Sequence, residues 1–333
     1  MKENYAYIDY LKLFFCICVI GIHAQIFYNF DNTFDYVLFH SVFRSAVPFF
    51  FVASTFFLGL KLKNKDLKDK NKIINKYLIR LIIPYIFWMV VSSFKVISML
   101  EGSILTKIIK LIRVALFNPW SALWYIWALI VFLIIYKILI NVFKDKFNIN
   151  VLLVISLVLY LIALLCNNYY FLIENTFMNK IINTYMNIFI TPRNGVLISI
   201  FMVLGLKLSD IKDMFNNKNK LIISSIILFI ILVIETLLIR NNSFLDDRSL
   251  YITFIAFIPV LFILFTKFKS NKNTTLIRNL STGLYFMHCP TLMLLKLFLV
   301  NEYILFISVI AIDTIILLVL YKINNKYINY VIK

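Results

Sequence analysis

The sequence predicts an all-α membrane protein with about ten transmembrane helices in one bundle. Hydrophobic residues make up 62% of the 333 residues and charged residues only 15%, which is far from the composition of a soluble globular domain. The apolar residues are gathered in long runs, and a run of roughly 20 residues can cross a bilayer as a helix. Helices are expected because lipid offers no hydrogen-bond partners to an open backbone.

Ten apolar runs are predicted to span the membrane. The connections 101–121 and 167–193 alternate apolar with polar positions, which predicts interfacial or re-entrant helices over one end of the bundle. No connection is long enough to form a second domain, so residues 1–333 are predicted to form one transmembrane domain. In chain order, the runs cover residues 8–28, 36–60, 81–100, 122–140, 149–166, 194–208, 221–239, 249–266, 281–300 and 303–321.

Lys and Arg concentrate in alternate connections, above all in residues 61–80. These residues accumulate in short cytoplasmic loops, so both termini are predicted to lie in the cytoplasm. The same pattern accounts for the net charge of +18 without a nucleic-acid partner, and none is expected. Cysteines occur only in or at the ends of apolar runs and lack metal-ligand spacing. We expect them to be small core residues, with no disulfide and no metal site.

Ionisable side chains inside the predicted spans point to function, because burying such groups in lipid is costly. His23 lies in the first span and Lys12 lies eleven residues before it. At 100° per residue, both lie on one helical face, about 16 Å apart along the axis. His23 is therefore a candidate catalytic residue, and Lys12 is a candidate substrate contact nearer the cytoplasm. The alternative for His23 is a hydrogen-bonded histidine that only packs the core.

Arg44 lies about two turns inside the second predicted span, so it must face protein or water. His40 and Pro48 each lie one helical turn from Arg44, so the three residues are predicted to form one stripe on the second span. Pro48 frees a backbone carbonyl, which is tolerated where a helix lines a cavity. Arg44 is predicted to be catalytic and to reach the depth of His23, and His40 is predicted to contact a substrate.

Four more residues are candidate substrate contacts. Arg193 stands at the outer mouth of the sixth span and binds an anion there or anchors the helix at the interface. Glu235 is an acid near the outer end of the seventh span, where it needs a partner. His288 either packs against neighbouring helices or belongs to the site. Trp124 opens the fourth span as part of an interfacial aromatic belt or of a sugar-binding face.

These residues stand in motifs that resemble the acyltransferase-3 family over essentially the whole chain, and the pair in the first span is the most specific part. Residues from Thr191 to Gly195 and from Asp247 to Tyr251 resemble the branch that contains the membrane domain of vancomycin-resistance serine racemases. Lys12 stands where the family has an arginine, and Val47 stands where many members have a second arginine. The motifs are Lys12-x10-His23, Phe43-Arg44-Ser-Ala-Val-Pro48-Phe-Phe-Phe-Val-Ala-Ser54, Trp124-Tyr-Ile-Trp-Ala-Leu129 and Leu280-Ser-Thr-Gly-Leu-Tyr-Phe-Met-His288.

The resemblance implies a ten-helix enzyme of the cell membrane that moves an acyl group, usually acetyl from acetyl-CoA, to a hydroxyl. The acceptors would be surface glycans, cell-wall polymers, lipids or small molecules. His23 would be the general base, Arg44 would stabilise charge on the thioester or orient the donor, and Lys12 would contact the donor. Acyl-CoA would be a co-substrate, and no bound cofactor is expected. The alternatives are a transporter or exporter of a small polar molecule, such as serine or a glycan intermediate, and a receptor-like or structural protein.

Overall fold

The computed structural model describes residues 5–28, 32–99, 101–117, 119 and 121–323. This part of the chain is all-helical, with thirteen α-helices and no strand. The helices are α1 (Ala6–Ala24), α2 (Thr33–Val37), α3 (Ala46–Leu62), α4 (Leu67–Met99), α5 (Ile104–Phe117), α6 (Trp124–Phe143), α7 (Ile149–Leu165), α8 (Met178–Phe189), α9 (Ser199–Ile211), α10 (Lys218–Leu238), α11 (Phe254–Thr266), α12 (Thr275–Leu295) and α13 (Glu302–Ile323). Short 3₁₀ turns cover Ser121–Leu123, Lys144–Lys146, Tyr170–Leu172 and Lys212–Met214.

Six helical segments within the described ranges are long and apolar enough to cross a membrane. They are α1, the continuous segment Thr33–Leu62 that includes α2 and α3, α4, α6, α10 and α13. Each of the ten predicted runs contains a helix, so the prediction of an all-α, multi-pass membrane protein is confirmed. The count of ten spans and the cytoplasmic termini stay predictions. Residues 1–4, 324–333 and Leu100, at the predicted end of the third span, lie outside the described residues.

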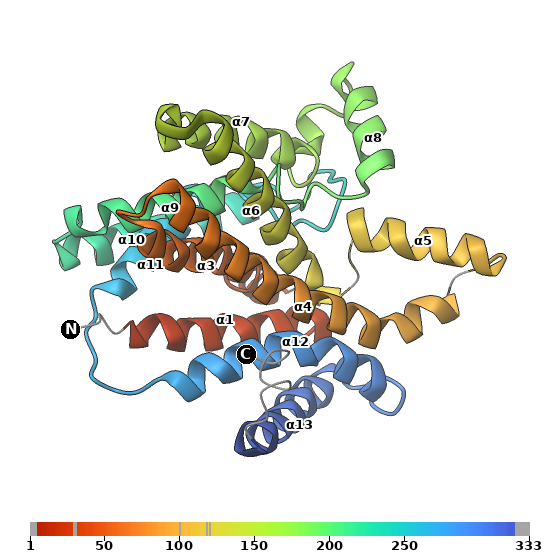
Figure 1. Ribbon diagram of the computed structural model, residues 1–333. Coiled ribbons are helices and arrows are strands. Elements are labelled where there is room, and N and C mark those ends of the chain that lie inside the picture. The colour runs from red at the N-terminus through yellow and green to blue at the C-terminus, as the bar shows by residue number, and fades with distance from the viewer. Residues whose placement is uncertain (1–4, 29–31, 100, 118, 120, 324–333) are drawn as a thin grey trace.

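Helix α3 forms the centre of the bundle and packs along α9 (Figure 1). It is the most deeply buried of the six long apolar segments. A Cβ atom at Gly205 of α9 would meet the backbone oxygen of Val52 and Oγ1 of Thr55. Small residues let helices approach closely in membranes, where van der Waals packing stabilises them. Helix α1 lies beside α12 and also contacts α3.

The second predicted span is not a regular α-helix, and this corrects one prediction. Leu38–Val42 forms a π-helical turn and Phe43–Ser45 forms a 3₁₀ turn, before α3 continues as an α-helix. These turns change the rotation per residue from that of a regular α-helix. Only part of the predicted stripe of His40, Arg44 and Pro48 reaches the cavity: Arg44 and Pro48 line it, whereas His40 lies outside its lining and contacts the carbonyl of Arg248.

Most of the predicted cytoplasmic connection 61–80 is helical, so the helix of the third predicted span begins before residue 81. Helix α4 begins at Leu67 and continues without a break through Pro84 to Met99. Asp66 caps its first turn, because the Asp69 amide donates to Oδ1 of Asp66 at 2.7 Å. Ile74 and Leu78 are buried on one face of this extension. Apolar residues spaced by one turn therefore fold the segment as a helix despite its high charge.

Helices α5 and α8 occupy the two connections that were predicted to hold helices outside the spans. They contact each other: Arg113 donates to the carbonyl of Asn187 at 3.1 Å, and the rings of Phe117 and Phe189 lie 5.9 Å apart. No residue of α5 is buried. Figure 1 shows both helices at one side of the bundle. Their placement at the membrane interface stays a prediction.

Candidate active site

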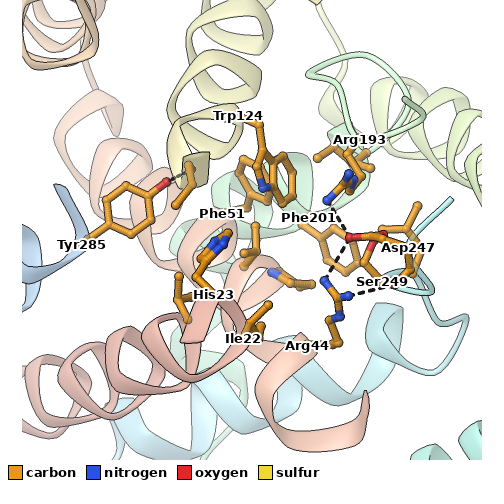
Figure 2. A pocket seen from close by; sticks show the side chains of 16 residues that line it. Ile22, His23, Arg44, Phe51, Trp124, Arg193, Phe201, Asp247, Ser249 and Tyr285 are labelled. Atoms are coloured by element: carbon orange, nitrogen blue, oxygen red, sulfur yellow. Dashed lines mark hydrogen bonds and ion pairs between the residues drawn. The ribbon is translucent and has the colours of Figure 1, made fainter. Parts of the chain in front are cut away.

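A cavity of about 230 Å³ lies where α1, α3 and α6 meet the segments that precede α9 and α11. Figure 2 shows His23, Arg44, Arg193 and Trp124 around this space. The structure thus brings together four of the eight predicted site residues. The lining consists of Val19, Ile22, His23, Arg44, Val47, Pro48, Phe51, Ala122, Trp124, Arg193, Ile198, Phe201, Asp247, Ser249, Leu250 and Tyr285.

His23 stands in the last turn of α1 and is partly exposed to the cavity. The helix ends one residue later, and Gln25 takes a left-handed conformation with φ of 64°. Among the described residues, the structure gives the imidazole nitrogens no hydrogen bond, whereas the backbone oxygen of His23 accepts from Nζ of Lys296 at 3.4 Å. A ring nitrogen is therefore available to a substrate in the cavity.

Arg44 is held by an aspartate from the segment before α11. Its Nη1 donates to Oδ2 of Asp247 at 3.0 Å, and its Nη2 donates to the carbonyl oxygen of Asp247 at 2.8 Å. The guanidinium also lies 5.2 Å from the ring of Phe39. Nε of Arg44 is buried and has no hydrogen-bond partner within the described part of the chain.

Arg193 joins the same ion-pair network. Its Nη1 donates to Oδ2 of Asp247 at 2.7 Å, and its Nε donates to Oδ2 of Asp246 at 3.1 Å. The guanidinium lies 5.2 Å from the ring of Trp124, which allows a cation–π interaction. Asp247 thus bridges Arg44 and Arg193, and these three residues are called the arginine clamp below.

The electrostatic state of Asp247 follows from these contacts. Burial would raise the pKa of its carboxyl group, but Arg193 and Arg44 outweigh that effect and hold the pKa below its usual range. The neighbouring Asp246 has a raised pKa because burial outweighs its attraction to Arg193. Asp247 is therefore ionised at neutral pH and offsets part of the charge of the two arginines.

Buried polar groups hold the segment that carries Asp247. Oδ1 of Asn167 accepts hydrogen bonds from the amides of Ser249 and Leu250 at 3.0 and 3.1 Å. Glu235 accepts from the amides of Ile252 and Thr253 at 2.7 and 3.0 Å, and Tyr169 also donates to it. Because these amides precede or begin α11, Glu235 acts as a cap on that helix.

Four predicted site residues lie away from the cavity lining. Nζ of Lys12 lies 4.6 Å from the ring of Phe57. Nδ1 of His40 donates to the carbonyl of Arg248 at 3.3 Å, so His40 supports the segment after Asp247. Glu235 caps α11, as described above. His288 is fully buried on α12, and its ring lies 5.3 Å from that of His23.

Sequence reasoning missed the acidic partners of the arginines. Asp246 and Asp247 stand in a predicted outer connection, and neither was predicted to be a site residue. Asp247 was named only as the first residue of a motif. One signal was present: Arg44 and Arg193 were both predicted near the outer side of the membrane, and buried arginines need anions. The adjacent acids Asp246 and Asp247 are a natural source of that charge.

The fold and the cavity define a multi-pass membrane protein with a charged site inside its helical bundle. The acyltransferase domain model matches residues 5–322. The chain therefore belongs to this acyltransferase family, the family that its motifs resemble.

Curated relatives agree with the branch that the sequence resembles. Two Enterococcus faecalis proteins, both named amino-acid racemase, are similar to this chain. One is 25% identical over 277 residues, which cover 83% of this chain and 38% of the relative. The other is 24% identical over 293 residues, which cover 86% of this chain and 41% of the relative. The chain thus spans about two fifths of the length of these relatives. No solved structure matches it.

Proposed function

We propose that the protein transfers an acyl group, most simply acetyl, from cytoplasmic acyl-CoA to a hydroxyl group. The acceptor would be a surface glycan, a cell-wall polymer or a small molecule, and the site of action would be the cell membrane. One observation carries the proposal: His23 and Arg44 line a single cavity inside the helical bundle of a chain that belongs to the acyltransferase family. A base and a cation are the two groups that acyl transfer to an alcohol requires.

His23 is the general base in this mechanism. A nitrogen of its imidazole accepts the proton of the acceptor hydroxyl while the hydroxyl oxygen attacks the thioester carbonyl. The tetrahedral intermediate then collapses: the carbon–sulfur bond breaks, and the CoA thiolate leaves with the proton from the imidazolium. The absence of a hydrogen bond to the His23 ring nitrogens among the described residues supports this role, because a nitrogen can then reach the acceptor.

Arg44 stabilises the negative charge that develops on the carbonyl oxygen. Asp247 engages both terminal nitrogens of its guanidinium and fixes its position, while Nε keeps a buried N–H without a partner among the described residues. A preorganised donor in a water-poor site contributes strongly to such charge stabilisation. Arg193 and Trp124, on the wall of the same cavity, would contact the acceptor.

The charge distribution supports donor access from the cytoplasmic side. Lys68, Lys72, Lys76 and Arg80 line a hollow of about 590 Å³ along the first part of α4. Four-residue spacing places these cations on one helical face, where they would attract the phosphates of CoA. Lys12, on the same helix as His23 and eleven residues before it, would then meet the donor between this face and the cavity.

Transfer of labelled acetyl from acetyl-CoA tests the proposal in membranes that contain the protein. His23→Ala is expected to lower product formation by about 10²- to 10⁴-fold, as for loss of a general base. Phe14→Ala is the matched control, because Phe14 lies on the same helix with an exposed side chain, and it should keep wild-type activity. Wild-type activity in His23→Ala would refute the role of His23. Uptake of a small polar molecule without acetylated product would favour the transporter.

A further inference from the structure

His23, His288 and Cys289 offer three ligand atoms that converge beside the cavity. One nitrogen from each histidine and Sγ of Cys289 all lie within 4.8 Å of one another. The histidines come from α1 and α12, which lie side by side, and His23 alone of the three lines the cavity. This cluster takes no part in the mechanism proposed above, apart from the His23 base.

The hydrogen bonds of His288 leave the lone pair of its Nε2 atom directed toward the cluster, where it can bind a metal. Nδ1 donates to the carbonyl of Leu284 at 3.0 Å, so the proton is on Nδ1 and Nε2 keeps its lone pair. Sγ of Cys289 lies 3.2 Å from Nε2, where the thiol donates to it. Metal-bound histidines commonly donate their other ring nitrogen to a carbonyl in this way, which fixes the tautomer and the ring orientation.

The spacing fits a tetrahedral ion. With metal–nitrogen and metal–sulfur distances of about 2.1 and 2.3 Å, neighbouring ligand atoms lie about 3.5 Å apart, so the cluster needs to close by about 1 Å. The ring of His23, which has no hydrogen bond to the described residues, can make that movement. Two imidazoles and a thiolate favour Zn²⁺ over Mg²⁺ or Ca²⁺. Three protein ligands leave a fourth position open to the cavity.

One buried acid lies beside the cluster and would favour a cation. Asp313 is fully buried on α13 and interacts electrostatically with His288. Its Oδ1 accepts from Oγ1 of Thr291 at 2.6 Å, while Oδ2 has no hydrogen bond within the described ranges. Cations also lie near His23: Nζ of Lys296 donates to the backbone oxygen of His23 at 3.4 Å, and the guanidinium of Arg44 is paired with Asp247. The thiolate of Cys289 and the carboxyl group of Asp313 would together offset the charge of a divalent ion.

We propose that His23, His288 and Cys289 bind Zn²⁺, and that bound Zn²⁺ blocks acyl transfer. The ion takes the lone pair of His23, which then cannot accept the acceptor's proton. The proposal that Zn²⁺ binds depends only on the geometry of the three ligands. The proposal that Zn²⁺ inhibits acyl transfer rests on the function proposed for His23. Metal binding displaces the thiol proton of Cys289 to solvent and makes the site responsive to the free concentration of Zn²⁺.

Metal content of the purified protein in detergent tests the site independently of activity. Wild type incubated with Zn²⁺ should bind one Zn²⁺ per chain, and Cys289→Ser should bind Zn²⁺ at least ~100-fold more weakly, since changes even to outer-sphere partners cost 10–100-fold. Cys166→Ser, at a buried cysteine in another part of the fold, should bind like wild type. Co²⁺ bound to wild type should give a thiolate-to-metal absorption band. This test needs only the wild-type protein, so it does not rely on the folding of a variant. Absence of this band from folded wild type, or equal Zn²⁺ binding by Cys289→Ser, would overturn the site.

Acyl transfer in the same preparations tests the block. Saturating Zn²⁺ should lower wild-type transfer at least tenfold, Mg²⁺ should have no effect, and Cys289→Ser should resist Zn²⁺. Uninhibited transfer by Zn²⁺-loaded wild type, or loss of transfer on chelation, would overturn the inhibitory role. A wild type that binds Zn²⁺ but transfers no acyl group under any condition would instead count against the proposed function and leave the metal site standing.

Discussion

Asp247→Asn tests whether the arginine clamp positions Arg44 for acyl transfer. Asp247 accepts hydrogen bonds from Arg44 at 3.0 Å and from Arg193 at 2.7 Å. Asparagine keeps the size of the side chain but removes the charge, so two largely buried guanidiniums would face each other without their shared anion. We expect Arg44 to move away from the position that it holds beside His23.

The size of the effect follows from burial. Removing one partner of a buried ion pair costs about 3–5 kcal/mol, and a hydrogen bond to a charged group contributes about 1.5–3 kcal/mol. The side chains of Asp247, Arg44 and Arg193 are 27%, 13% and 18% exposed, so solvent screens part of the loss. A cost of about 3 kcal/mol corresponds to a fall in kcat/KM of roughly 100-fold.

Asp246→Asn is the matched control, because Asp246 pairs with Arg193 but not with Arg44. It should lower kcat/KM for acetyl transfer less than about tenfold. Arg44→Gln and the double variant with Asp247→Asn complete a double-mutant cycle, in which the two single effects should not add. A kcat/KM of Asp247→Asn within threefold of wild type would refute the positioning role of the arginine clamp. An equal loss of kcat/KM in Asp246→Asn and Asp247→Asn would also refute it.

Three other predictions concern stability in detergent. Glu235→Gln loses one acceptor for the amides of Ile252 and Thr253, so it should lower the free energy of unfolding by about 1–3 kcal/mol. The Tm should fall, and an unchanged Tm would contradict the capping role. In Gly205→Val the new side chain meets the backbone of Val52, so the variant should lose about 3 kcal/mol or more of unfolding free energy. In Gly283→Ala the new Cβ meets only side-chain atoms, so the loss of stability should be smaller. A lower Tm for Gly283→Ala than for Gly205→Val would count against close packing of α3 and α9. Because the pKa of Asp247 is held below its usual range, its contribution is present above the unfolded pKa of about 3.9 and is lost as pH falls further. The Tm difference between wild type and Asp247→Asn should therefore be constant from about pH 8 to 5 and narrow below about pH 4; narrowing already near neutral pH would contradict this.

Much of the site could be predicted from His23 and Arg44 alone, because ionisable residues inside apolar runs need a polar or hydrated environment. The structure places both at one cavity, together with Arg193 and Trp124. His40 was predicted to contact a substrate, but it lies outside the cavity lining and contacts the carbonyl of Arg248 instead. The π-helical and 3₁₀ turns between residues 38 and 45 could not be predicted from the spacing of these residues.

Helix α4 begins well before the third predicted span. Its first turns carry many lysines, and charge indicated a cytoplasmic connection. Ile74 and Leu78 nevertheless form an apolar face that packs against the bundle. Charge on one face and apolar residues on the other stabilise a helix that extends beyond the span.

The sequence by itself determined that this protein is a multi-pass helical membrane protein of the acyltransferase-3 family, because hydrophobic run length and short motifs are local properties of the chain. Only the tertiary structure decided which charged groups meet. Arg44 and Asp247 are 203 residues apart in sequence, and His23 and His288 come from opposite ends of the chain. Their meeting depends on how α1, α3, α12 and the segment before α11 pack, and that packing arises from contacts between distant helices rather than from any local pattern.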